Sequence, residues 1–136
     1  MTDGENKLRE LVLLRGARNN VLSAESEEEL LEIAVAQLNL TLQRAQGVII
    51  ATAESAGYEV QSEIDRVTEA MVVALSASSR AISHADFETV ASYHAGKMNF
   101  SLLAARRRIK EIVERLKINP ERSGLLWSAR WFRTIR

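Results

Sequence analysis

A chain of 136 residues, of which 46% are hydrophobic, can bury one core without disulfides or metal ions to hold it together. It has no cysteine, which excludes disulfides, zinc–thiolate sites and thiol catalysis and suits the reducing cytoplasm. The net charge is zero, but the two halves differ: residues 1–68 hold 6 basic and 12 acidic side chains, and residues 69–136 hold 12 basic and 6 acidic ones. Opposite charges on the two halves could join chains head to tail or present a basic end to phosphate.

The chain shows the features of a cytoplasmic, mostly helical protein. Its first residues, MTDGENKLRE, lack the apolar run of a secretion signal, and no stretch approaches the roughly 18 uncharged apolar residues of a membrane-spanning helix. One proline and six scattered glycines leave little to interrupt helices, and strand-like alternation is absent. We therefore expect an all-α bundle of five or six helices in a single domain, 1–136.

The strongest pattern follows a first predicted helix at about residues 5–20. Ser23 or Ser26 is placed to cap a second helix, and the glutamates between 25 and 32 are expected to form its solvated first turn rather than a cation site. An apolar stripe then recurs every three or four residues, with the spacing of a coiled coil. Its members are Leu31, Val35, Leu38, Leu42, Ala45, Ile49, Thr52 and Ala56. The stripe predicts one helix over about 25–56, which Gly57 ends.

A third helix with the same rhythm is predicted at about 61–81, behind a cap at Ser62. Because only a short turn separates it from 25–56, the two should form a long antiparallel hairpin, and the alternative is one bent helix. Ser83 predicts a fourth helix from His84 to about residue 96, and a fifth runs from a cap at Asn99 to about residue 117. The caps at Ser62 and Ser83 are similar, but no convincing internal repeat is evident.

The sequence offers no catalytic or metal-binding constellation. His84 and His94 are ten positions apart on one predicted helix, about 15 Å along its axis, which is too far to share a metal ion. There is no phosphate-binding loop, dinucleotide-binding turn or nucleophile elbow. We therefore expect no enzymatic activity, no cofactor or metal, and no small-molecule substrate.

A basic cluster lies on the fifth predicted helix, and it leaves two interpretations open. Its candidate residues for binding an anion or nucleic acid are Arg106, Arg107, Arg108 and Lys117. Pairs four residues apart, Arg107–Glu111, Lys110–Glu114 and Glu111–Arg115, are predicted to neutralise part of it along the helix surface. The cluster is then either a solvated helix face or a site for nucleic acid.

The segment 119–136 is a possible docking tail. Trp127, Trp131 and Ile135 recur every four residues and would line one side of a short helix, with Arg130 and Arg133 on another side. The aromatic side could dock on the chain's own core, enter a groove of another protein, or lie on a membrane surface. These five residues are the candidate partner-binding site.

The sequence favours a non-catalytic helical module for protein–protein interaction or assembly, such as an adaptor, regulator or small structural subunit. We expect it to form a homo-oligomer through surplus apolar surface on the hairpin, or to bind another helical protein. The alternative is a nucleic-acid-binding protein that uses the basic C-terminal region, and peripheral membrane contact is a lesser possibility.

Overall fold

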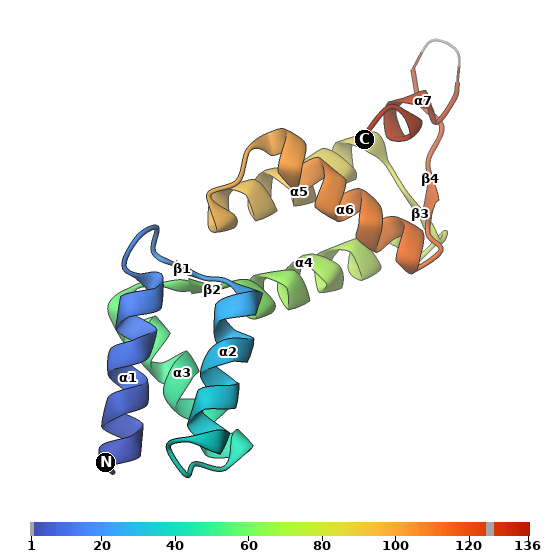
Figure 1. The fold of residues 1–136 in the computed structure, drawn as a ribbon. Coiled ribbons are helices and arrows are strands. Elements are labelled where there is room, and N and C mark those ends of the chain that lie inside the picture. The colour runs from blue at the N-terminus through green and yellow to red at the C-terminus, as the bar shows by residue number, and fades with distance from the viewer. Residues whose placement is uncertain (1, 125–126) are drawn as a thin grey trace. The chain divides into compact units, whose positions relative to one another are not determined.

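The computed structural model describes residues 2–124 and 127–136, and most of these residues are helical. The chain divides into an N-terminal unit, Met1–Glu63, and a C-terminal unit, Ile64–Arg136. Figure 1 shows the elements in chain order, which are α1 (Asp3–Gly16), β1 (Val21–Leu22), α2 (Ala24–Ala36), α3 (Leu42–Ala56), β2 (Glu59–Val60), α4 (Gln61–Ser76), β3 (Ala81–Ile82), α5 (His84–Met98), α6 (Leu102–Arg115), β4 (Asn119–Pro120) and α7 (Arg130–Arg133). No helix in the described ranges combines the length and apolar character needed to cross a membrane.

The N-terminal unit is a bundle of three helices, in which α3 packs most extensively on α1 and also on α2. Each helix begins at a hydroxyl side chain that accepts a hydrogen bond from the first turn: Thr2, Ser23 and Thr41. The three helices share one buried apolar cluster, formed by Leu8, Val12, Leu22, Leu30, Ala34, Ala45, Val48, Ile49, Ala53 and Val60. Burial of this cluster supplies the main stabilisation of the unit.

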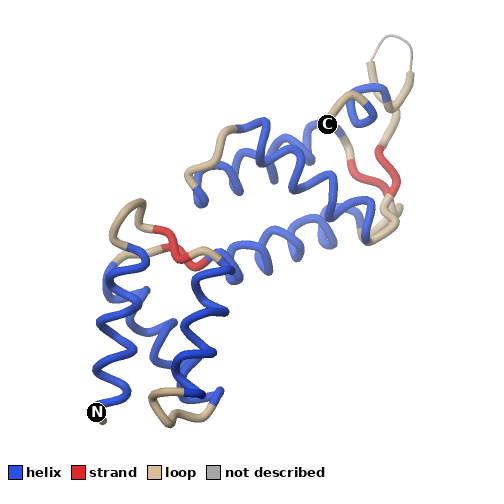
Figure 2. Tube along the Cα trace, in the orientation of Figure 1, coloured by secondary structure: helices blue, strands red, loops and turns tan. Residues whose placement is uncertain are grey.

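A two-residue parallel ladder joins the segment that follows α1 to the segment that follows α3. Val21 pairs with Glu59 and Leu22 pairs with Val60. Figure 2 shows this ladder, in red, and a second one in the C-terminal unit. Asn20 precedes the ladder with φ of 60°, in the left-handed region that asparagine tolerates better than most residues. The ladder ties two segments that are distant in sequence.

The C-terminal unit repeats this element order. Its two strands and its helices α5 and α6 begin 60 residues after their counterparts, as Val21 and Ala81 show, whereas α7 has no counterpart. The left-handed backbone positions recur as the pairs Asn20 and Arg80, Asn39 and Asn99, and Gly57 and Lys117. The helix caps recur as Ser23 and Ser83, and as Thr41 and Ser101. The repeat was not evident in the sequence, because the residues that recur are mainly helix caps and left-handed backbone positions. Most of the core side chains differ between the two units.

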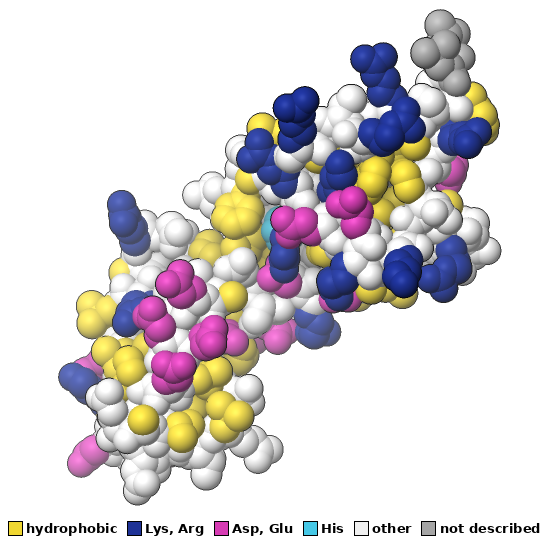
Figure 3. Space-filling model, turned by 45° about the vertical axis from the view of Figure 1, so that its right-hand side comes forward, with side chains coloured by type: hydrophobic (Ala, Val, Ile, Leu, Met, Phe, Trp, Pro, Cys, Tyr) yellow, Lys and Arg dark blue, Asp and Glu magenta, His cyan; other side chains and the backbone are white. Residues whose placement is uncertain are grey.

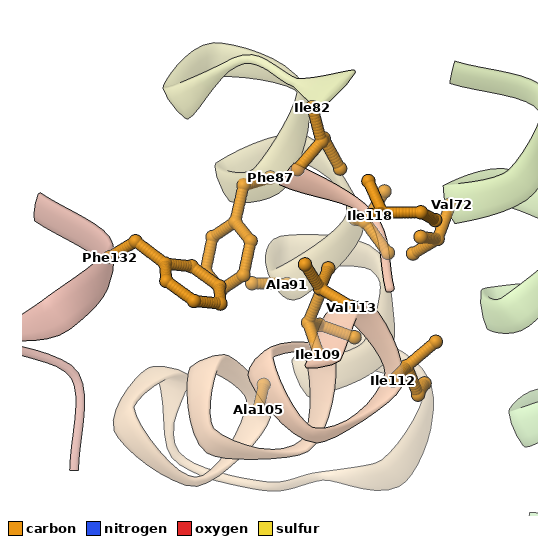
Figure 4. Close-up of a cluster of buried hydrophobic side chains, with 11 residues drawn as sticks. Val72, Ile82, Phe87, Ala91, Ala105, Ile109, Ile112, Val113, Ile118 and Phe132 are labelled. Atoms are coloured by element: carbon orange, nitrogen blue, oxygen red, sulfur yellow. The ribbon is translucent and has the colours of Figure 1, made fainter. Parts of the chain in front are cut away.

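The core of the C-terminal unit lies mainly between α5 and α6, with α7 at one end. Figure 4 shows the Phe87 and Phe132 rings facing each other beside the isoleucines and valine of α6. The ring centroids are 6.0 Å apart at an interplanar angle of 84°, a favourable edge-to-face arrangement. The buried cluster comprises Val72, Ile82, Phe87, Val90, Ala91, Ala105, Ile109, Ile112, Val113, Ile118 and Phe132.

The predicted antiparallel hairpin of 25–56 and 61–81 is wrong. The first segment is two helices, because Asn39 adopts a left-handed conformation and Thr41 caps a new helix at Leu42. Helix α3 packs on α1 and α2 instead of on α4. The stripe from Leu31 to Ala56 was thus two unrelated apolar stripes in matching phase, and Val35 and Leu42 on it are 49% and 54% exposed.

Other boundaries were closer. Helix α5 begins at His84 behind Ser83, as predicted, and Ile82 and Phe87 both join the core. Asn99 does not cap the next helix: it closes α5 in a left-handed conformation, and Ser101 is the cap of α6. The described residues hold seven helices, more than the five or six expected, because 25–56 is divided and α7 is a separate element of four residues.

Candidate functional site

The tail after β4 is anchored on the core of its own unit. Phe132 is 8% exposed and belongs to the buried cluster, and Trp131 and Ile135 pack against it. The Trp131 ring stacks on His84 with centroids 4.5 Å apart, and its indole Nε1 donates a hydrogen bond to the Glu121 carbonyl oxygen at 2.9 Å. Trp131 and Ile135 are therefore docked on the chain's own core, which was the first of the three interpretations of the tail.

Trp127 does not share a face with Trp131 and Ile135, because α7 covers only Arg130–Arg133. Phe132, which anchors the tail, was not among the predicted residues, because it lies outside the four-residue spacing of Trp127, Trp131 and Ile135. Leu125 and Leu126 of the predicted docking tail lie outside the described residues.

Trp127 is held on a closed loop with 68% of its surface exposed. The loop is closed by two backbone hydrogen bonds between Ser123 and Ser128, of 2.9 and 3.2 Å. Gly124, with φ of 82°, makes the turn, and the Trp127 amide donates to its carbonyl oxygen at 3.1 Å. The large aromatic side chain of Trp127 is thereby presented to solvent.

Trp127 borders a surface pocket of about 580 Å³, which we call the C-terminal pocket. It is lined by Asn119, Pro120, Arg122, Trp127, Ser128, Ala129 and Arg133. Arg122 and Arg133 are exposed, and neither forms an ion pair with any residue in the described part of the chain. Two uncompensated guanidinium groups beside an exposed indole have the charge and geometry that suit carboxylates or other anions.

The structure does not bring the predicted basic cluster to this pocket. Arg106 donates to Glu88 through both Nε and a terminal nitrogen, at 2.9 Å each, and this bond raises the Arg106 pKa. Arg108 pairs with Asp65 at 3.2 Å, and Arg107 donates to the carbonyl oxygen of Arg136. Intramolecular partners thus occupy these arginines.

The three pairs predicted along the α6 surface are wrong, although Glu111 does pair with Arg108 of the same helix at 3.2 Å. Two further arginines of α6 pair with carboxylates of other helices, Arg106 with Glu88 of α5 and Arg115 with Glu69 of α4, because packing brings those helices against α6. Lys110 donates to the Ile135 carbonyl oxygen and lies 5.1 Å from the Phe132 ring centroid. Lys117 ends α6 in a left-handed conformation, exposed and away from the pocket lining.

A buried polar cluster of Asp65, Thr68, His94 and Arg108 is the second unusual feature of the C-terminal unit. His94 is fully buried, and its Nδ1 lies 3.1 Å from the Thr68 hydroxyl. Asp65 Oδ1, His94 Nε2 and Arg108 Nε are buried without a hydrogen-bond partner in the described structure. Burial lowers the pKa of His94, with opposing influences from Asp65 and Arg108.

The repeat shows that the fold does not require most of this polarity. The positions of Thr68, His94 and Arg108 correspond, 60 residues earlier, to the buried apolar Leu8, Ala34 and Val48, whereas Asp65 corresponds to the buried Glu5, which pairs with Arg44. An unsatisfied buried polar group costs stability, so this cluster lowers the stability of the C-terminal unit.

We expect His94 to destabilise the C-terminal unit as the pH falls. Its folded pKa is lowered, so the unfolded chain binds the proton first, and the stability contributed by neutral His94 is complete above about pH 6.5 and is lost as the pH falls from there toward the folded pKa. Chemical denaturation from pH 7.5 to 5, followed by tryptophan fluorescence, measures this. His94→Leu should lose less stability than wild type over this range, and parallel curves for the two proteins would refute the assignment.

Comparisons with protein-family models, with curated proteins and with solved structures give no match. Within the described residues, no group of three or more histidine, aspartate or glutamate side chains is arranged to hold a metal ion. A proposal for the C-terminal pocket therefore rests on the chemistry of the residues that line it.

Proposed function

We propose that the chain is a non-catalytic protein–protein interaction module whose C-terminal pocket binds an acidic helical surface. One observation carries the proposal: Arg122, Arg133 and the exposed Trp127 line a single pocket without carboxylate partners in the described structure. Arginine and tryptophan contribute most to the binding energy of protein interfaces. Guanidinium groups match carboxylates in geometry as well as in charge.

The charge of the surrounding unit supports an acidic partner. The C-terminal unit carries 13 basic and 7 acidic side chains, a formal charge of +6. Figure 3 shows lysine and arginine side chains gathered over this unit on the face drawn. Such a field would attract an acidic partner and speed its association at low ionic strength.

The anchoring of the tail also supports binding. Trp131 and Phe132 fix α7 to the core, and the Ser123–Ser128 hydrogen bonds close the loop that presents Trp127. A preordered site loses less conformational entropy when it binds than a flexible tail does. Nucleic-acid binding is the weaker candidate, because Arg106, Arg107 and Arg108 are occupied by intramolecular partners.

Titration with labelled probes tests the proposal. The probes are a helical peptide with glutamates at spacings of three and four, the same peptide with glutamines, and a short DNA duplex. We expect the glutamate peptide to bind at low salt and Arg122→Gln/Arg133→Gln to weaken it by more than about tenfold, because each charge-assisted hydrogen bond contributes about 1.5–3 kcal/mol.

The matched control is Arg80→Gln/Lys117→Gln, which removes two positive charges from the same unit outside the pocket lining. It should change peptide affinity by less than about twofold, since neither side chain lines the pocket. Equal loss in both variants, or preference for the DNA over the glutamate peptide, would overturn the proposal.

A further inference from the structure

The N-terminal unit carries a surface that complements the C-terminal pocket. Glu25, Glu28, Glu32 and Val35 follow one another at spacings of three, four and three, so they share one face of α2, opposite the buried Leu30 and Ala34. All four are exposed, and none of the three glutamates forms an ion pair within the part of the chain that is described. We call these four residues the acidic stripe.

The acidic stripe is a property of one unit and not of the fold. Its equivalents 60 residues later are Ala85, Glu88, Ser92 and Ala95, which retain a single carboxylate. That carboxylate, Glu88, already binds Arg106. The N-terminal unit as a whole carries 5 basic and 11 acidic side chains, a formal charge of −6 that equals and opposes the charge of the C-terminal unit.

We infer that the C-terminal pocket of one copy binds the acidic stripe of a second copy of this chain, an inference that rests on the proposed function of the pocket. The glutamates lie on one helical face that can meet Arg122 and Arg133, and Val35, 49% exposed, gives Trp127 an apolar neighbour. Because both surfaces belong to the same sequence, every copy offers one of each.

Such a contact joins unlike surfaces, and every copy carries one stripe and one pocket. Copies can therefore close into a ring, of which a reciprocal dimer is the smallest, or extend as an open chain with a free stripe at one end and a free pocket at the other. Assembly should be favoured at low salt, because its charged groups are exposed and are screened as the ionic strength rises.

Two variants separate the surfaces. Glu25→Gln/Glu28→Gln/Glu32→Gln neutralises the stripe and leaves the pocket, while Arg122→Gln/Arg133→Gln neutralises the pocket and leaves the stripe. At low salt, multi-angle light scattering should find each variant alone near the 15.2 kDa of one chain. An equimolar mixture should reach about twice that mass and stop there, because the intact stripe of one variant can bind only the intact pocket of the other.

The control variant Glu10→Gln/Glu54→Gln/Glu63→Gln removes three charges from the N-terminal unit outside α2 and should assemble like wild type. A mixture that stays at the mass of one chain would overturn the inference, as would variants that assemble alone as far as wild type does. If wild type remains one chain while the pocket still binds the glutamate peptide, the self-contact is refuted and the proposed function stands. If the peptide also fails to bind, both are refuted.

Discussion

Replacing Phe132 with alanine is expected to destabilise the C-terminal unit by about 3–5 kcal/mol, the usual cost of deleting a buried aromatic side chain. The ring is 8% exposed, packs edge-to-face on Phe87, and lies 5.1 Å from the Lys110 ammonium. Its loss leaves a cavity and removes the main attachment of α7. The pocket residue Arg133, on the same short helix, then loses its fixed position.

Thermal and denaturant unfolding measure this effect, and tryptophan fluorescence assigns it to the C-terminal unit because Trp127 and Trp131 are both there. The matched control is Trp127→Ala, which removes a larger aromatic group from the same tail at an exposed position and should change stability by less than about 0.5 kcal/mol. If the two alanine variants unfolded at the same denaturant concentration, the tail would not be docked through Phe132.

Replacing Gly16 with serine is expected to destabilise the N-terminal unit by about 1–3 kcal/mol, the cost of forcing extra atoms into a packed interior. A Cβ atom at Gly16 would lie 2.3 Å from the Tyr58 ring, which covers the end of α1. The ring cannot easily move, because the Tyr58 hydroxyl donates a hydrogen bond to the Leu13 carbonyl oxygen at 2.8 Å.

The repeat provides a specific rescue. The residues at the corresponding places in the C-terminal unit are Ser76 and Ile118, so the smaller Ile118 accompanies the larger Ser76. Gly16→Ser/Tyr58→Ile should therefore be more stable than Gly16→Ser alone, although the lost tyrosine hydrogen bond keeps it below wild type.

Circular dichroism during denaturation measures the four members of this double-mutant cycle. Gly47→Ala is the control, since a Cβ there meets nothing within 4 Å and should stabilise α3 slightly. Additive effects of the two substitutions would show that Gly16 and Tyr58 are not packed together as described.

Local signals in the sequence predicted most of the helices, whereas features that depend on residues far apart in the chain were not predicted. Ser83 and His84 were placed correctly because a cap depends on residues within one turn. The break before Leu42 was missed because the apolar spacing continued across it in phase, although the left-handed Asn39 and the helix cap at Thr41 mark it. The short parallel ladders could not be foreseen from two-residue segments whose partners are nearly forty positions away.

The candidate site was predicted in part. Trp127 and Arg133 were chosen for their residue types and do line one pocket, but Arg122 was not chosen, since nothing in its sequence neighbourhood distinguishes it. Trp131 and Ile135 have the same four-residue spacing as Trp127 but pack inward, because the length of α7 and the burial of Phe132 depend on tertiary packing. The partners of Arg106 and Arg108 likewise come from other helices.

If opposite charges on the two units join copies of the chain, the mass of the wild-type protein in solution should depend on salt and on protein concentration. Light scattering should give a mass above 15.2 kDa at low salt that rises with protein concentration, and a return to 15.2 kDa at high salt. A mass of 15.2 kDa at every concentration in low salt, or an assembly whose mass does not change with salt, would contradict it.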